Sequence, residues 1–197
     1  MNQIIEIIQK TKNTQGKIVI AIDGRCGAGK TTLGNYLSKV LDANLFHMDD
    51  YFLRPIQRTK ERYEEAGGNV DRERFKEEIG NKLHTDEDII YTPFDCKRMS
   101  LTSPIHVKQK RITIVEGSYS LHPYLRDLYD ISIFMTISES LRMERIQKRN
   151  PDKVDDFINQ WIPFEEKYFL TYEIEDICDY VLWADALKDN GELVLEK

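Results

Sequence analysis

The stretch Asp23–Thr31, DGRCGAGKT, decides the fold predicted for this chain of 197 residues. From Gly24 to Thr31 it has the spacing G-x-x-x-x-G-K-[ST]. Glycines at such a turn can adopt positive φ angles, which lets successive backbone N–H groups point inward and surround phosphate oxygens. The stretch therefore predicts a phosphate-binding loop, and the alternative is an ordinary glycine-rich turn between a strand and a helix.

The segments on either side of this loop favour the phosphate-binding interpretation. KIVIAI at 17–22 is a continuous apolar run, which is typical of a strand buried on both faces. TTLGNYLSKVLD at 31–42 has apolar residues at helical spacing, and the N-terminus of such a helix attracts phosphate. The residues expected to contact a nucleoside triphosphate are Gly24, Arg25, Cys26, Gly27, Ala28, Gly29, Lys30, Thr31 and Thr32.

Three residues of the loop carry reactive groups. Lys30 is expected to reach the β- and γ-phosphates and to serve catalysis, and the Thr31 hydroxyl is expected to bind Mg²⁺. Cys26 is interpreted as a small residue tolerated in the loop; the alternative is a catalytic thiol, but no histidine base is near it in sequence. The loop thus predicts ATP and Mg²⁺ as cofactors.

Apolar runs alternate with helical patterns along the rest of the chain. This alternation predicts a parallel sheet covered by helices on both faces, with any ligand at one edge of the sheet. Further strands are predicted at 43–48, 111–117, 130–137 and 179–183. Helices are predicted at 1–10, 71–83 and 138–150, with one or two more around Pro163, and the least regular stretch, 54–70, is interpreted as a flap.

The composition limits the classes of partner. The net charge is −6, so a broad basic surface for nucleic acid is not expected, and an anion should bind in a local basic pocket. Three cysteines without C-x-x-C spacing are interpreted as free thiols in a reducing compartment. The apolar start of the chain is too short for a membrane span and lacks the features of a signal peptide, so we expect no membrane association and a cytoplasmic location.

Acidic residues follow two of the predicted strands. Asp49 and Asp50 end the strand at 43–48, at the sheet edge that faces the loop. A carboxylate there can accept a proton from an attacking hydroxyl and help to hold Mg²⁺; the alternative is that both residues cap the next turn. Glu116 ends another apolar strand, as in a Walker B site. Thr31, Glu116 and Asp49 are therefore the predicted Mg²⁺ residues.

The helix at 138–150 carries three arginines. Arg145 and Arg149 are four residues apart and share one face, so their charges can close over the transferring phosphate as a lid. The alternative is a solvated basic face, which is favoured more for Arg142 than for the other two. Arg145 and Arg149 are accordingly predicted to be catalytic.

Four segments in order, GRCGAGKTTL at 24–33, HMDDYF at 47–52, IVEGSYS at 114–120 and LRMERIQKRN at 141–150, resemble the uridine kinase-like branch of P-loop small-molecule kinases. That group includes pantothenate kinase and phosphoribulokinase. The resemblance extends from Ile18 to about Trp183. It implies an α/β three-layer P-loop sandwich with a mainly five-stranded parallel sheet of order 2-3-1-4-5 and a helical lid. Residues 1–197 would form one domain, with the lid at approximately 142–160 and a substrate-binding insert at approximately 54–107.

The resemblance also implies roles for single residues. Asp49 matches the base that activates the acceptor hydroxyl, and Arg145 and Arg149 match the lid. Asp71 lies near the acidic residue that grips ribose hydroxyls, although an alignment shifted by two would place Asn69 there. The residues predicted to bind the acceptor are Asp49, Tyr51, Asp71, Phe94 and Arg98.

The stretch TPFDCKRM at 92–99 departs from the family pattern. Nucleoside kinases of this branch read the pyrimidine with a tyrosine and a histidine, where this chain offers Phe94 and Met99. Neither side chain can donate a hydrogen bond to a base, so the pocket is expected to discriminate weakly. Lys97 and Arg98 hint at an anionic acceptor, unless both are exposed to solvent in a hairpin.

Three functions are consistent with these patterns. The first is an ATP-dependent kinase that phosphorylates a hydroxyl of a nucleoside such as uridine or cytidine. The second is the same reaction on a non-nucleoside metabolite, such as a pantothenate-like compound or a sugar phosphate. The third is a nucleotide-binding NTPase or regulatory module. The expected partner is a small-molecule hydroxyl acceptor, and a homo-oligomer is left open.

Overall fold

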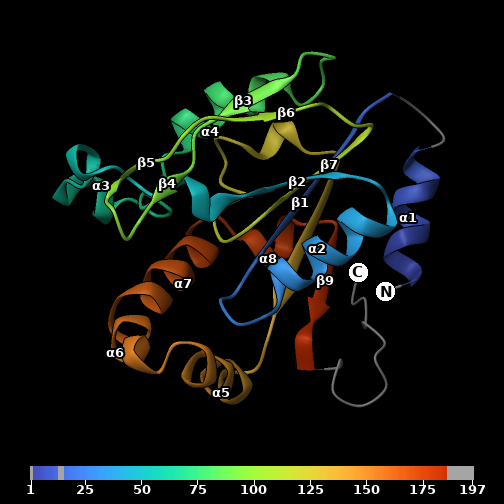
Figure 1. Ribbon diagram of the computed structural model, residues 1–197. Helices are drawn as coiled ribbons and strands as arrows, with labels where there is room; N and C mark the ends of the chain where they lie inside the picture. Colours follow the sequence, from blue (N-terminus) through green and yellow to red (C-terminus); the bar gives the residue numbers. More distant parts are fainter. Residues whose placement is uncertain (1, 13–15, 186–197) are drawn as a thin grey trace.

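A five-stranded parallel sheet lies at the centre of the computed structural model, which describes residues 2–12 and 16–185 (Figure 1). The strands have the spatial order β2-β7-β1-β8-β9, which is 2-3-1-4-5 when only the strands of this sheet are numbered along the chain. Every neighbouring pair in the sheet is parallel. The predicted α/β fold class is confirmed. The strands are β1 (Ile18–Gly24), β2 (Asn44–His47), β7 (Ile112–Glu116), β8 (Ile131–Thr136) and β9 (Tyr180–Trp183).

Strand β1 is apolar throughout because both of its faces are buried. Its isoleucines face one core cluster, which also contains side chains of helices α1 (Asn2–Lys12) and α2 (Lys30–Val40). Val19 and Ala21 face a second cluster with side chains of α4 (Arg72–Glu78), α7 (Ile162–Thr171) and α8 (Ile174–Ile177). The sheet is thus covered on both faces, and this explains the unbroken apolar run in the sequence.

Short helical segments follow β2 and continue into the insert. They are the 3₁₀ turns η1 (Met48–Tyr51), η2 (Pro55–Gln57) and η3 (Gly80–Lys82), together with α3 (Lys60–Glu64). The helix predicted at 71–83 is shorter in the structure, because α4 ends at Glu78 and a 3₁₀ turn follows. Asp71 caps α4 by accepting the backbone N–H of Arg74.

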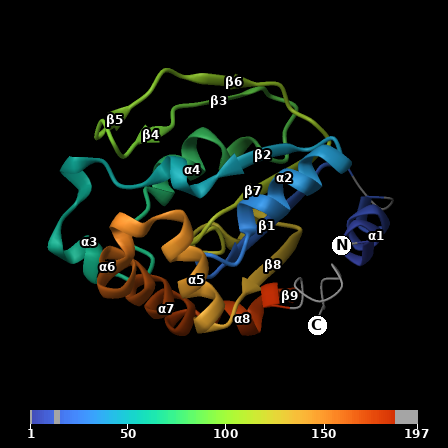
Figure 2. The ribbon, with the colours of Figure 1, turned by 60° about the horizontal axis from the view of Figure 1, so that its bottom comes forward.

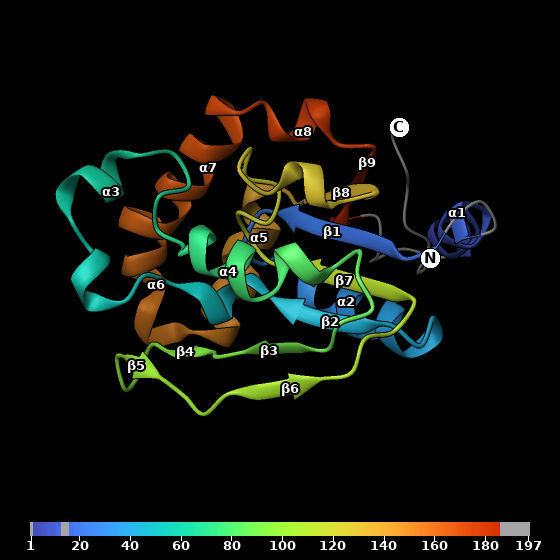
Figure 3. The ribbon, with the colours of Figure 1, turned by 90° about the horizontal axis from the view of Figure 1, so that it is seen from above.

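The insert continues as a long antiparallel hairpin. Strands β3 (Ile89–Tyr91) and β6 (Ile105–Val107) pair with each other, as do β4 (Phe94–Asp95) and β5 (Ser100–Leu101). Figures 2 and 3 show the hairpin alongside β2 and α4, on the side of the molecule away from α8. The insert was expected, but its strands were not, because these strand segments are only two or three residues long.

The predicted lid is a chain of short helices. It comprises α5 (Glu139–Arg149), η5 (Pro151–Lys153), α6 (Val154–Asp156) and the π-helical turn η6 (Phe157–Trp161), which leads into α7. A third apolar cluster joins Cys26 of the loop to Ile146 and Phe157, so these helices pack directly on the loop. One further 3₁₀ turn, η4 (Arg126–Leu128), precedes β8. No helix in the two described ranges is both long and apolar enough for a membrane span.

The segment after β7 contains a buried histidine with an unusual pKa. Burial, together with the positive charge of Arg72, lowers the pKa of His122 to about 4. The pKa of an unfolded histidine is about 6.5. As the pH falls below that value, His122 binds a proton in the unfolded state but stays neutral in the folded state. The free energy of unfolding therefore decreases.

We expect this histidine to remove about 1 to 2 kcal/mol of stability between pH 7 and pH 5, after allowance for solvent screening. Urea unfolding at both pH values should show a larger loss in the wild type than in His122→Asn. Comparing the two pH values within each protein cancels the cost of the substitution itself. The same loss in both proteins would show that His122 is not the titrating group.

Candidate active site

The phosphate loop, residues 24–31, and the carboxyl ends of β2 and β7 border a cavity of about 760 Å³, called the main cavity below. The hairpin and the predicted lid supply the other walls. Parallel sheets place the ends of neighbouring strands at the same edge, which explains why segments distant in sequence meet here. The lining includes Gly27, Gly29, Lys30, Thr31, Thr32, Asp49, Glu116, Cys96, Met99, Phe157 and Trp161.

The phosphate loop has the backbone geometry that a phosphate site needs. Gly24, Gly27 and Gly29 all have positive φ angles. A Cβ on Gly24 would lie 2.0 Å from the carbonyl oxygen of Met135, so only glycine fits there. The loop leads directly into α2, whose first backbone N–H groups have no partner within the helix. These N–H groups and the positive end of α2 fit a phosphate group.

Lys30 is folded back over the loop. Its Nζ donates hydrogen bonds to the carbonyl oxygens of Gly24, at 2.6 Å, and Arg25, at 3.1 Å. The side chain of Arg25 lies elsewhere, where it pairs with Glu166 at 3.0 Å and packs on the ring of Phe134. Arg25 therefore contributes backbone to the loop and uses its side chain to anchor the loop to α7.

The predicted magnesium residues meet beside the loop. The Thr31 hydroxyl donates to both oxygens of Glu116, at 3.1 and 3.2 Å. Nδ1 of His47 is 2.5 Å from the same carboxylate, and this contact raises the pKa of His47. Within the described residues, no three His, Cys, Asp or Glu side chains form a metal cluster. Mg²⁺ commonly takes only one or two carboxylates together with substrate phosphates, so the hydroxyl and carboxylate oxygens fit this ion.

Asp49 lies in the main cavity, in the 3₁₀ turn that follows β2. Its side chain is open to the cavity, but the surrounding protein raises its pKa by desolvation, Lys30 opposes that rise, and Glu116 adds to it. A raised pKa makes a carboxylate a stronger base. No side chain caps this turn, so the structure gives no support to the capping alternative. Asp50 is half-buried and does not line the cavity.

Glu165 is a buried site residue that the sequence analysis missed. Its carboxylate accepts the backbone N–H of Cys26 at 3.0 Å and the hydroxyl of Ser118 at 2.6 Å. The contact joins α7 to the phosphate loop and to the turn after β7. Burial and Glu165 raise the pKa of the Cys26 thiol to about 12, which favours the interpretation of Cys26 as a small packing residue. The sequence had indicated only one or two helices around Pro163.

The three lid arginines have different positions. Arg149 lines the main cavity, and its Nε donates to the Asn150 side chain at 2.9 Å. Arg145 does not line the cavity; its Nη1 donates to the Gly27 carbonyl oxygen at 2.8 Å. Arg142 is buried and pairs with Glu166 at 2.7 Å, so it fastens helices rather than facing a ligand.

Four of the predicted acceptor residues do not reach the main cavity. Tyr51 is buried in the core, where its hydroxyl donates to Glu78, and Phe94 is also buried. Arg98 is 81% exposed and faces Asp95 of the hairpin. The fourth residue, Asp71, is considered next.

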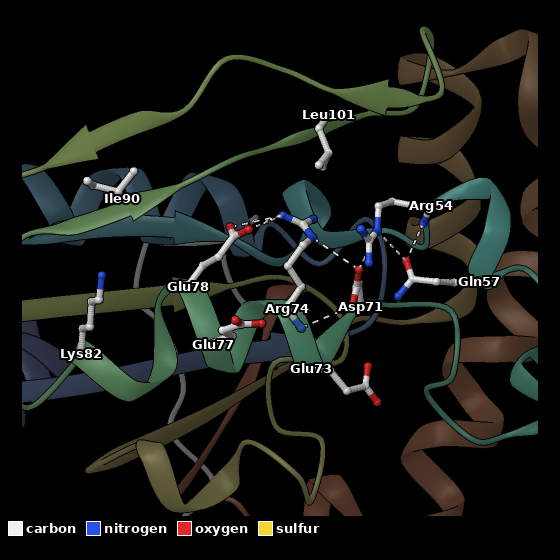
Figure 4. A pocket seen from close by; sticks show the side chains of 10 residues that line it. All are labelled: Arg54, Gln57, Asp71, Glu73, Arg74, Glu77, Glu78, Lys82, Ile90 and Leu101. Atoms are coloured by element: carbon white, nitrogen blue, oxygen red, sulfur yellow. Dashed lines mark hydrogen bonds and ion pairs between the residues drawn. The ribbon is translucent and has the colours of Figure 1, made fainter.

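Asp71 lines a second, smaller cavity between α4 and the hairpin (Figure 4). It forms ion pairs with Arg54 at 3.4 Å and with Arg74 at 3.3 Å. Burial and the cap of α4 fix its carboxylate there. Asn69 lies in the main cavity instead and hydrogen-bonds to Tyr119. The structure therefore places Asn69, and not Asp71, in the main cavity, and the role of either residue in binding an acceptor stays a prediction.

Comparisons with known proteins find similarity to kinases. The Shikimate kinase family model matches residues 26–93. Uridine-cytidine kinase D of Dictyostelium discoideum is 26% identical over 132 residues, which are 67% of this chain and 26% of that protein. The resemblance to uridine kinase-like P-loop kinases is confirmed. The chain spans about a quarter of that relative's length, 26%, so activity and substrates of the whole protein do not transfer directly.

Solved structures of P-loop kinases have the same fold as this chain. A structure described as a possible uridine kinase from Bacillus stearothermophilus has a TM-score of 0.68 at 23% identity, covering 90% of this chain and 96% of that one. D-glycerate 3-kinase from Cryptococcus neoformans has a TM-score of 0.57 at 15% identity, covering 91% and 88%. At these identities the likeness concerns the fold alone, and the acceptors of the two proteins differ. The P-loop kinase fold therefore leaves the acceptor undetermined.

Proposed function

We propose that this protein transfers the γ-phosphate of Mg-ATP to a hydroxyl group of a small molecule. The observation that carries the proposal is that Asp49 shares one cavity with Lys30, Thr31 and Glu116. Phosphoryl transfer depends on holding the triphosphate, stabilising its charge and orienting the attacking group, and this cavity holds side chains suited to each task.

Each residue has a defined part in the proposed reaction. The N–H groups of the phosphate loop hold the phosphate oxygens, and the Lys30 ammonium leaves its loop carbonyls to balance their charge. Thr31 and Glu116 hold Mg²⁺, which would neutralise charge on the transferred group when bound. Asp49 accepts the proton of the attacking hydroxyl, and Arg149 adds positive charge from the lid.

Two acceptor classes are supported by different observations. A nucleoside is suggested by the similarity to uridine-cytidine kinases. A non-nucleoside metabolite is suggested by the cavity, whose hairpin wall is formed by Cys96 and Met99. These side chains offer little hydrogen bonding to a pyrimidine, and one apolar wall gives limited discrimination.

The experiment that tests the kinase proposal is ATP turnover by the purified protein in the presence of candidate acceptors. The panel should contain nucleosides, pantothenate-like compounds, hydroxy acids and sugar phosphates. Acceptor-dependent ADP release, with a phosphorylated product detected by mass spectrometry, is the expected result. Slow ATP hydrolysis that no acceptor changes would instead favour an NTPase or regulatory module.

A further inference from the structure

The main cavity contains two cations outside the phosphate loop that the proposed reaction does not use. Arg58 comes from the segment between η2 and α3, and Lys153 comes from η5 of the lid. Arg58 thus reaches the cavity from the insert, and Lys153 reaches it from the lid. Three acidic residues line the same cavity: Asp49, Glu116 and Glu165.

Arg58 is held in place without an acidic partner. Its Nε donates to the carbonyl oxygen of Leu53 at 2.9 Å, and its guanidinium carbon lies 5.8 Å from the centre of the Phe94 ring. No ion pair of Arg58 occurs within the part of the chain that the structure describes. Its two terminal nitrogens remain able to donate to a ligand, and a guanidinium fork suits carboxylate and phosphate oxygens.

Lys153, like Arg58, lies near an aromatic ring and has no acidic partner among the described residues. Its Nζ lies 5.6 Å from the centre of the Trp161 ring, and it forms no ion pair among residues 2–12 and 16–185. Burial of the Cys96 thiol raises its pKa. The positive charges of Arg58 and Lys153 oppose this rise. Asp49 acts on the same thiol with the opposite sign. The two cations, the proposed base and Cys96 all line the main cavity, which agrees with this electrostatic influence.

Two of the three acidic groups of the cavity are engaged near the phosphate loop, and the third, Asp49, is the proposed base and forms no ion pair with Arg58 or Lys153. Glu116 contacts Thr31 and His47, and Glu165 holds Cys26 and Ser118. At the hairpin, Asp95 accepts backbone N–H groups of its own turn. Arg58 and Lys153 thus have no ion-pair partner among the described residues, and the lining of the same cavity also includes the neutral amide of Asn69.

Two of the three cations that line the second cavity, Arg54 and Arg74, have a structural role. Arg54 and Arg74 point toward Asp71, and Arg74 also contacts Glu78 (Figure 4). Both of these arginines have carboxylate partners from the protein. The contrast with the main cavity indicates that Arg58 and Lys153 are available for an external anion.

We propose that the phosphate acceptor carries an anionic group, a carboxylate or a phosphate ester, which binds between Arg58 and Lys153. The acceptor hydroxyl then points toward Asp49. This inference rests on the proposed kinase function and names its substrate class. It also replaces the sequence-based hint from Lys97 and Arg98, neither of which lines the main cavity.

The first test compares acceptors that differ in charge. Neutral polyols, sugars and nucleosides should be assayed beside hydroxy acids and sugar phosphates, each with saturating Mg-ATP. We expect kcat/KM to be higher for the anionic group. Arg58→Met and Lys153→Met should each raise KM for the anionic acceptor about tenfold or more, since a charge-assisted hydrogen bond is removed, and leave KM for ATP nearly unchanged.

Lys97→Met is the matched control, because Lys97 is an exposed cation of the hairpin outside the cavity. It should behave as the wild type. Arg58→Lys keeps the charge and should recover part of the affinity. Transfer to neutral acceptors alone would overturn the anionic acceptor while leaving the kinase proposal intact. Transfer to no acceptor, with ATP hydrolysis unchanged, would contradict both.

A binding measurement tests the anion site without a known acceptor. The phosphate loop is first saturated with Mg²⁺ and a non-hydrolysable ATP analogue, and inorganic phosphate is then titrated while tryptophan fluorescence is recorded. Trp161 is next to Lys153, so saturable quenching is expected. Arg58→Met should weaken phosphate binding about tenfold, and Lys97→Met should not. Equal phosphate affinity in the wild type and Arg58→Met would overturn the proposal.

Discussion

Replacing Asp49 by Asn should reduce phosphoryl transfer by about 10²- to 10⁴-fold, the usual contribution of a positioned general base. The amide cannot accept the hydroxyl proton, yet it has nearly the same size as the carboxylate. Asp49 forms none of the contacts that hold Lys30 to the loop, so ATP affinity should change little. Steady-state kinetics with the best acceptor and a separate ATP-binding titration measure the two effects.

Asp50→Asn is the matched control for this variant. Asp50 belongs to the same 3₁₀ turn but does not line the main cavity. It should keep nearly the wild-type rate. If Asp49→Asn retained full turnover, Asp49 would not be the base, and an equal loss in both variants would point to a disturbed turn instead.

Lys30→Ala is expected to have an effect of comparable size through a different step. Lys30 is the cation nearest the phosphates in the proposed complex, and removing one preorganised charge from such a site commonly costs 10²- to 10³-fold in kcat. Unlike Asp49→Asn, this variant should also bind ATP more weakly. Single-turnover measurements at saturating ATP separate the loss in chemistry from the loss in binding.

Lys39→Ala provides the control for Lys30→Ala. Lys39 is an exposed lysine in the last turn of the same helix, α2. Its removal changes the net charge equally but leaves the loop untouched. Lys30 would have no special role if both variants lost the same activity. A thermal melt of each variant excludes unfolding as the cause.

The fold was largely predictable because its signals are local. A continuous apolar run such as 17–22 is compatible with a strand buried on both faces, and the glycine-rich loop ends that strand at a defined point. Alternation with helical segments then limits the topology to a parallel sheet. A hairpin was only an alternative for Lys97 and Arg98, and the strand pairs within 89–107 were not predicted, because their pairing depends on contacts across the turn and the short segments have weak patterns of their own.

The candidate site was predicted in part for the same reason. Glu116 ends β7, and Asp49 comes shortly after the end of β2. Because the carboxyl ends of these parallel strands lie beside the phosphate loop, the topology alone brings both residues to the main cavity. Asp71 was predicted to bind the acceptor, but it lies outside the main cavity, where it caps α4 and pairs with Arg54 and Arg74. A shift of two residues cannot be resolved from one sequence, because the insert has no regular pattern to fix the alignment.

The sequence by itself determined the phosphate loop, the parallel sheet and the acidic residues at the strand ends. These features follow from backbone freedom at glycine and from the period of apolar residues along single segments. Only the tertiary structure decided that Asn69, Glu165, Arg58 and Lys153 line the main cavity, whereas Asp71 and Arg98 lie outside it. The reason is that these residues come from the insert, the lid and α7, and only the packing of these segments around the phosphate loop decides which of their side chains line the cavity.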